Sequence, residues 1–184
     1  SPAGATTAEL LPTRENPWLG QAVPGPNPMP FGSNLAVFGY HSAPTFTPDG
    51  SQVYFAADYS FEQIYGSRFE DGEWTVPETV TFSPNMTSYR DPFVSPDGKR
   101  LYFISQDPLP GGTPDRKENI WVMEKDGEDW GEPQPLPDSV NQLELHWTIS
   151  VDASYNLYLS AKNGKYPDIY VSRYVNGQYT TPIL

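Results

Sequence analysis

The sequence predicts an all-β fold, a β-propeller built from four-stranded antiparallel blades. Three observations favour it. A unit of roughly 50 residues occurs three times, its apolar residues alternate with the period of a β-strand, and no segment has a persuasive helical period. Repeated four-stranded antiparallel units of this length are typical of propeller blades.

The first half of the repeat predicts a short innermost strand, a turn at an aspartate, and a second, alternating strand. Its copies are HSAPTFTPDGSQVYFAA (41–57), YRDPFVSPDGKRLYFIS (89–105) and ELHWTISVDASYNLYLSA (144–161). The shared aspartates Asp49, Asp97 and Asp152 lie 48 and then 55 residues apart. In the third copy Ala153 stands where Gly is expected, so we expect an altered turn between unaltered strands.

The second half of the repeat predicts a third and a fourth strand joined by a hairpin. QIYGSR (63–68), NIWVME (119–124) and DIYVSR (168–173) align without gaps. An Asp-Gly or Asn-Gly pair follows each copy and is a strong hairpin signal. An aromatic residue comes next, and a proline three residues later suits an outer edge strand. We predict that the aromatic residues pack between blades and do not form a sugar-stacking row: Trp74, Trp130 and Tyr179.

The segment SPDGKRLYF (95–103) resembles the repeat of the TolB-like, WD-repeat-like β-propeller proteins of bacterial envelopes, and the resemblance extends over residues 41–184. It implies a periplasmic or extracellular binding or scaffold module without a cofactor. Such a module would hold a protein, peptide or glycan at the mouth of the central channel. The repeat is also similar to that of propeller-fold polysaccharide lyases, so a carbohydrate-active enzyme is the alternative. A peptidase would need a separate catalytic domain.

The chain is organised as one domain with an N-terminal arm. Residues 1–40 are rich in proline and are expected to form an extended arm that latches a blade. The blades are expected at about 41–88, 89–143 and 144–184. Three blades are fewer than the four to eight of a closed ring. The six-bladed ring that we expect could be completed by further chain or by a second copy, or residues 1–40 could add a partial blade.

Composition excludes several classes of function. With 11 basic and 23 acidic side chains the formal charge is −12, which disfavours nucleic acid and anionic membrane surfaces as partners. The absence of cysteine excludes disulfides, thiolate metal sites and cysteine nucleophiles. No apolar run approaches the roughly 18 residues of a membrane span. The chain begins at Ser1, so we expect that the N-terminus was processed or cut.

Residues just before each innermost strand are expected to ring the channel mouth. The candidate ligand-binding residues at these positions are His41, Tyr89, Arg90, Asp91, Glu144 and His146. Two histidines beside carboxylates suit a divalent metal or acid–base catalysis. The same side chains could instead hydrogen-bond to exposed loop backbone, and both interpretations stay open here. An open set of three blades would also expose apolar faces, so self-association is a further expectation.

Overall fold

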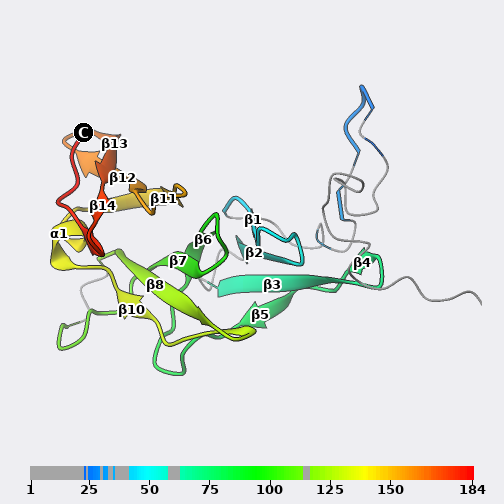
Figure 1. The fold of residues 1–184 in the computed structure, drawn as a ribbon. Helices are drawn as coiled ribbons and strands as arrows, with labels where there is room; N and C mark the ends of the chain where they lie inside the picture. Colours follow the sequence, from blue (N-terminus) through cyan, green and yellow to red (C-terminus); the bar gives the residue numbers. More distant parts are fainter. Residues whose placement is uncertain are drawn as a thin grey trace, which may run out of the picture.

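The computed structural model describes residues 23, 25–29, 31–32, 35, 42–57, 63–113 and 117–184, with only the backbone at residues 145–147 and 163. The described chain is almost entirely β-structure, in three consecutive blades (Figure 1). Blade 1 contains β1 (Thr45–Phe46), β2 (Gln52–Ala57), β3 (Gln63–Glu70), β4 (Glu73–Trp74) and β5 (Glu78–Val80). Blade 2 contains β6 (Arg90–Val94), β7 (Arg100–Ser105), β8 (Asn119–Asp126), β9 (Asp129–Trp130) and β10 (Gln134–Pro135). Blade 3 contains β11 (Leu145–Val151), β12 (Leu157–Asn163), β13 (Tyr166–Ser172), β14 (Tyr174–Val175) and β15 (Gln178–Tyr179).

Each blade is the antiparallel meander that the repeat predicts, except that its fourth strand is divided. In blade 1 both β4 and β5 pair with β3, and in blade 2 both β9 and β10 pair with β8. The interruption coincides with Pro77 and Pro133, which lie between the two pieces. Proline has no N–H to donate to a ladder, so pairing stops there and resumes beyond it. Blade 3 repeats this plan, with an isolated bridge between Val171 and Ile183 just after Pro182.

The turn between the first two strands explains why the aspartate recurs. In blade 1, Asp49 Oδ1 accepts hydrogen bonds from Thr47 Oγ1 (2.6 Å) and from the backbone N of Ser51 (3.0 Å). In blade 2, Asp97 Oδ1 accepts the equivalent bonds from Ser95 Oγ (2.7 Å) and Lys99 N (3.1 Å). The carboxylate thus satisfies the backbone of a tight turn, which is the ordinary use of Asp at this position.

The third turn differs from the sequence alignment. Asp152 N donates to Asn156 O (3.1 Å), as Ser95 N donates to Arg100 O (2.8 Å), so Asp152 is equivalent to Ser95 and not to Asp97. The turn is one residue shorter, and Tyr155 takes a left-handed conformation with φ 61°. A bulky residue rarely adopts this conformation without compensation.

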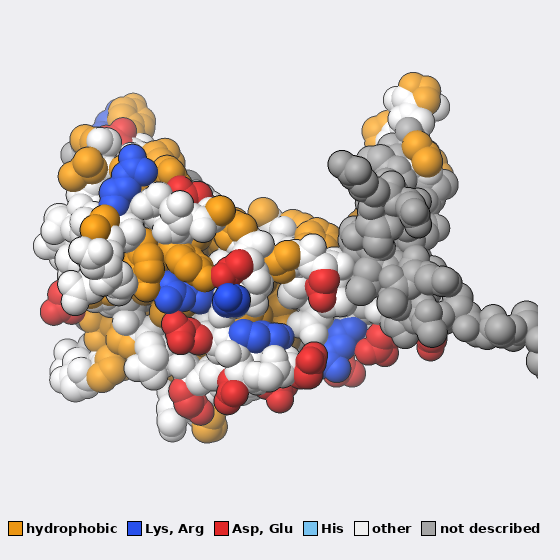
Figure 2. Space-filling model, viewed as in Figure 1, with side chains coloured by type: hydrophobic (Ala, Val, Ile, Leu, Met, Phe, Trp, Pro, Cys, Tyr) orange, Lys and Arg blue, Asp and Glu red, His pale blue; other side chains and the backbone are white. Residues whose placement is uncertain are grey.

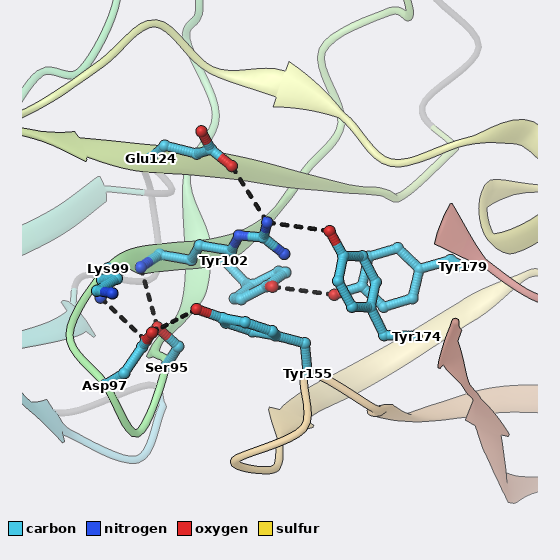
Figure 3. A network of polar contacts seen from close by, with 9 residues as sticks. Ser95, Asp97, Lys99, Tyr102, Glu124, Tyr155, Tyr174 and Tyr179 are labelled. Atoms are coloured by element: carbon cyan, nitrogen blue, oxygen red, sulfur yellow. Dashed lines mark hydrogen bonds and ion pairs between the residues drawn. The ribbon is translucent and has the colours of Figure 1, made fainter. Parts of the chain in front are cut away.

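The compensation for Tyr155 is a polar network that joins blades 2 and 3 (Figure 3). Its hydroxyl donates to Asp97 across the blade boundary. The Arg100 guanidinium lies 4.3 Å from the centre of the Tyr155 ring and 5.0 Å from that of Tyr174. Arg100 also donates to the Tyr174 hydroxyl (3.0 Å) and pairs with Glu124 (3.2 Å). The hydrogen bond to Asp97 raises the pKa of Tyr155 to about 12.

We expect acid to weaken the fold through these aspartates. Partial burial acts to raise the pKa of Asp97, but hydrogen bonds from Tyr155 and Ser95 outweigh it and lower that pKa. The pKa of Asp152 is lowered first by its bond from Asn156. A lowered folded-state pKa stabilises the fold above the unfolded value of 3.8, and the effect is lost as the pH falls through the folded-state pKa. Urea unfolding midpoints should therefore drop below about pH 4. The drop should be smaller in Asp97→Asn, and an identical pH profile in that variant would contradict the assignment.

The core consists of apolar layers between consecutive blades. Tyr54 and Ile64 of blade 1 pack with Leu101, Phe103 and Met123 of blade 2. A second layer joins the other face of blade 2 to blade 3, with the buried residues Tyr102, Ile104, Ile120, Ile149, Leu157 and Leu159. Alternating residues of each second strand therefore face opposite neighbours, as their period of two requires.

Two of the three strand-four aromatics, Trp130 and Tyr179, pack between blades, as the sequence analysis predicted. Trp130 Nε1 donates to the Tyr54 hydroxyl of the preceding blade at 3.0 Å, with the rings edge to face. Tyr179 repeats this contact one blade later, where its hydroxyl lies 2.9 Å from that of Tyr102. Trp74 is 2% exposed and lies beside Phe31, with ring centres 6.4 Å apart.

The outer face of blade 3 has no such cover among the described residues. Ile64, Ile120 and Ile169 occupy the same position of the repeat. The first two are 0% exposed, whereas Ile169 is 61% exposed. At the other end, Leu35 packs on the outer face of blade 1 with Val53 and Phe55. Most of the predicted N-terminal arm, residues 1–40, lies outside the described residues, so its latching of a blade stays a prediction.

One short helix, which the sequence did not predict, lies in the connection from blade 2 to blade 3. This helix is α1 (Asp138–Asn141), and four residues are too few to show a helical period. Its last residue, Asn141, is 2% exposed and hydrogen-bonds to the backbone of β8. The helix thus attaches the connection to blade 2.

Candidate site at the mouth of the channel

The innermost strands of the three blades converge on a cavity of about 240 Å³. Its walls come from the segment ending in β1, from β6 and from β11. The polar residues among them are Ser42, Thr45, Asp91, Thr148 and Ser150. Asp91 is the charged member of this lining, and Pro44, Pro92, Phe93 and Ile149 supply apolar surface. The cavity is large enough for one side chain or sugar ring and small for a complete drug-sized ligand.

Both β6 and β11 have an irregular pairing register where they line this cavity. The pairing register of β6 shifts between Arg90 and Phe93, and that of β11 shifts between His146 and Ile149. Asp91 lies within the first shift and has a left-handed φ of 44°. Bulges bend a strand and redirect its side chains, and they are over-represented beside functional sites. Backbone conformations of this kind also cluster at ligand sites.

A buried hydrogen bond sets the spacing of the first two blades beside the cavity. Thr45 Oγ1 accepts from the backbone N of Val94 at 3.0 Å, and the two residues are 9% and 4% exposed. Val94 N would otherwise be buried without a partner at the blade boundary. A hydroxyl at position 45 therefore links the innermost strands of two blades.

Of the six residues predicted at the mouth, Asp91 lines the cavity, whereas Tyr89 points into the core. Tyr89 is 1% exposed and packs against Phe82 and Phe103. Its hydroxyl donates to Ser83 O (3.0 Å) and accepts from Ser83 N (3.1 Å). Burial raises its pKa, so it is a neutral structural residue near neutral pH.

Arg90 and Glu144 each form an ion pair. Arg90 Nη1 lies 2.5 Å from Glu118 Oε1, and both side chains are largely buried. Glu118 ends the long loop between β7 and β8, so this loop is attached to the start of β6. Glu144 Oε1 lies 3.2 Å from Lys162 Nζ at an exposed position. These pairs order the loops around the mouth.

The two histidines are described least. His41 lies outside the described residues, and for His146 the structure describes the backbone within β11 alone. Within the described part of the chain, no three His, Cys, Asp or Glu side chains are grouped as a metal site would require. The metal or acid–base interpretation of the histidines stays a prediction.

The sequence analysis missed the hydroxyl residues of the lining, Thr45, Thr148 and Ser150. They lie a few residues farther along each innermost strand than the predicted positions. Their repeat positions could have been found by counting back from the turn, but the bulges shift which residue faces the cavity.

Comparison with known structures identifies the architecture. TolB from Acinetobacter baumannii is similar over 78% of this chain and 33% of its own, with a TM-score of 0.53 and 18% sequence identity. A puromycin-hydrolysing peptidase of Mycobacterium tuberculosis is similar over 76% of this chain and 22% of its own, with a TM-score of 0.50 and 20% identity. The fold is that of a β-propeller.

The likeness extends to only part of each of these two proteins, because the chain spans a third or less of their lengths. At these identities the comparison shows the fold alone. No protein-family model and no curated protein sequence matches the chain. In the described part of this propeller, no helix is long and apolar enough to cross a membrane.

Proposed function

We propose that the protein is a propeller binding module that recognises a protein, peptide or glycan at the channel-mouth face. The observation that carries the proposal is the cavity to which the innermost strands of all three blades contribute. Its hydroxyls, one carboxylate and apolar patches suit a ligand with both polar and apolar groups, as binding sites usually do. The periplasm or the extracellular space is the compartment we propose for this role.

The size of the cavity favours insertion of a single group from a larger partner. A volume of about 240 Å³ holds one side chain or ring. Asp91 would accept hydrogen bonds from that group, and Thr148 and Ser150 would contact it from β11 of the neighbouring blade. Affinity would then depend on Asp91 more than on the outer loops, because hydrogen bonds to charged groups contribute roughly 1.5–3 kcal/mol.

The test uses ligands selected on the full chain from a displayed random peptide library and from a glycan array. Asp91→Asn should weaken a selected ligand about 10- to 100-fold in titration calorimetry. Asn tolerates a left-handed φ, so this variant keeps the backbone. Ser150→Trp should block the cavity, and Asp138→Asn serves as the control for a lost surface charge. Equal binding by all four proteins, or steady chemical conversion of the ligand, would overturn the proposal.

We propose further that another blade covers the outer face of blade 3. Ile169, Val171 and Ile183 lie there, and the first and last are each 61% exposed. In blades 1 and 2 the equivalent face is covered by the blade that follows. Further chain or a second copy would supply this cover, and a six-bladed ring is the closed form that we expect.

A further inference from the structure

Three hydroxyl groups in the lining of the channel-mouth cavity have a hydrogen that no described residue accepts. They belong to Thr45, Thr148 and Ser150. Thr45 is 9% exposed, and its Oγ1 accepts from Val94 N (3.0 Å), but within the described part of the chain this hydroxyl donates to nothing. A buried donor without an acceptor costs free energy, so a ligand that offers Thr45 an acceptor is favoured.

The carboxylate of Asp91 supplies the opposite half of the hydrogen-bonding pattern. Its two oxygens together offer about four acceptor positions and no donor. The cavity therefore presents donors from β1 and β11 and acceptors from β6, the innermost strands of three successive blades. A ligand that matches this lining must both donate and accept hydrogen bonds.

A charged or a purely apolar group matches only part of this lining. An ammonium or guanidinium group is a donor alone, so it would pair with Asp91 but leave the Thr45 hydrogen without an acceptor. An anion would be repelled by Asp91 and by the net charge of −12, and acidic side chains follow the lower edge of the molecule in Figure 2. An apolar group would bury the carboxylate without compensation. The matching group is therefore neutral and polar.

The spread of the polar groups and the apolar lining favour a sugar ring over a carboxamide. A carboxamide carries its acceptor and its donor at one end, whereas the polar groups of the cavity lie on three strands. The hydroxyl groups of a pyranose surround the ring, and each of them both donates and accepts. Pro44, Pro92 and Phe93 supply apolar surface for the C–H faces of such a ring. The volume of about 240 Å³ is enough for one ring.

We propose that the channel-mouth cavity binds one neutral pyranose residue of a glycan, an inference that rests on the binding function proposed above. Neighbouring hydroxyl groups of the sugar donate to Asp91, and another accepts from Thr45. Thr148 and Ser150 bond to the ring from β11. Acidic sugars are rejected because they would place a second carboxylate beside Asp91.

The first arm of the test titrates the unaltered, isotope-labelled chain with four neutral methyl pyranosides: the glucoside, the mannoside, the galactoside and the N-acetylglucosaminide. At least one should bind with a Kd below about 10 mM and shift the amide resonance of Val94, whose N–H bonds to Thr45. Methyl glucuronide, n-butylamine and propionamide should bind at least about 10-fold more weakly than the preferred pyranoside. No shift with any pyranoside, or tighter binding of the amine, the amide or the glucuronide, overturns the proposal.

The second arm places the sugar in the cavity. Thr148→Val removes one hydroxyl at an exposed position and should weaken the preferred pyranoside about 3- to 10-fold, and Asp91→Asn should weaken it about 10-fold or more. Thr79→Val is the matched control, because Thr79 is an exposed strand residue outside the cavity lining. Unchanged binding in the two cavity variants, or an equal loss in the control, puts the sugar elsewhere and overturns the proposal.

The selected peptides of the previous test separate failure of the sugar assignment from failure of the binding function. If Asp91→Asn weakens a selected peptide while no pyranoside shifts the spectrum, the cavity binds a peptide and the sugar assignment fails alone. If neither peptides nor sugars bind at the cavity, both proposals fail.

Discussion

Ile120→Ala should lower the free energy of unfolding by about 2–5 kcal/mol, the usual cost of emptying a buried isoleucine site. Ile120 is 0% exposed and packs in the layer between blades 2 and 3 with Tyr102 and Leu157. The shortened side chain would leave a cavity bounded by two blades that share this layer. Urea unfolding of the wild type and the variant, fitted with a common slope, measures the difference.

Ile169→Ala is the matched control, because Ile169 holds the same repeat position on blade 3. In three blades without further cover Ile169 is 61% exposed, and its loss should then change the free energy of unfolding by less than about 0.5 kcal/mol. A loss as large as that of Ile120→Ala is the result expected if another blade covers Ile169 in solution, as proposed above. Repeating the measurement at low protein concentration then distinguishes a covering blade from further chain and one from a second copy, since only cover by a second copy weakens on dilution.

This pair of isoleucines also shows how far the sequence could predict the fold. The gapless alignment of the third strands placed Ile64, Ile120 and Ile169 at one position, and the structure confirms the strand and its pairing. The repeat likewise predicted that Trp130 and Tyr179 pack between blades, because equivalent residues of similar blades contact equivalent residues of the preceding blade. Burial of the same position differs between blades, because it depends on what lies beyond the blade, which the repeat does not encode.

The candidate site was harder to predict for a local reason. Period-two alternation tells which side chains share a face only within a paired ladder. Tyr89 precedes the ladder of β6 and turns into the core, while the shift after Arg90 brings Asp91 to the cavity. The alignment of the third turn was wrong for a similar reason. Asp152 was aligned with Asp97, but the loop is one residue shorter, so Asp152 holds the position of Ser95. A one-residue change in a turn or bulge has no signature in composition or spacing.

The side chain of Asn141 takes the place of a missing strand on β8. Its Oδ1 accepts from Ile120 N (2.8 Å), and its Nδ2 donates to Ile120 O (3.2 Å) and to Leu136 O (2.9 Å). Beyond the end of β10, Leu136 N still donates to Ile120 O (2.9 Å), but among the described residues no backbone carbonyl accepts from Ile120 N, so the carboxamide completes the ladder as a peptide group would. The side chain is 2% exposed, so water does not readily replace it.

Asn141→Ala should therefore lower the free energy of unfolding by about 2–4 kcal/mol, because each buried polar group left without a partner costs roughly 1–3 kcal/mol. Asn141→Asp should cost at least as much, since it keeps the acceptor but places an oxygen against the two carbonyl oxygens that Nδ2 now serves. Gln142→Ala is the control: its side chain is exposed and bonds locally to Ser139 O (2.9 Å), so its loss should cost less than about 0.5 kcal/mol. Urea unfolding of the three variants, with amide exchange at Ile120, measures the effect. If Asn141→Ala unfolds like Gln142→Ala while Ile120 stays protected, the carboxamide does not complete the ladder.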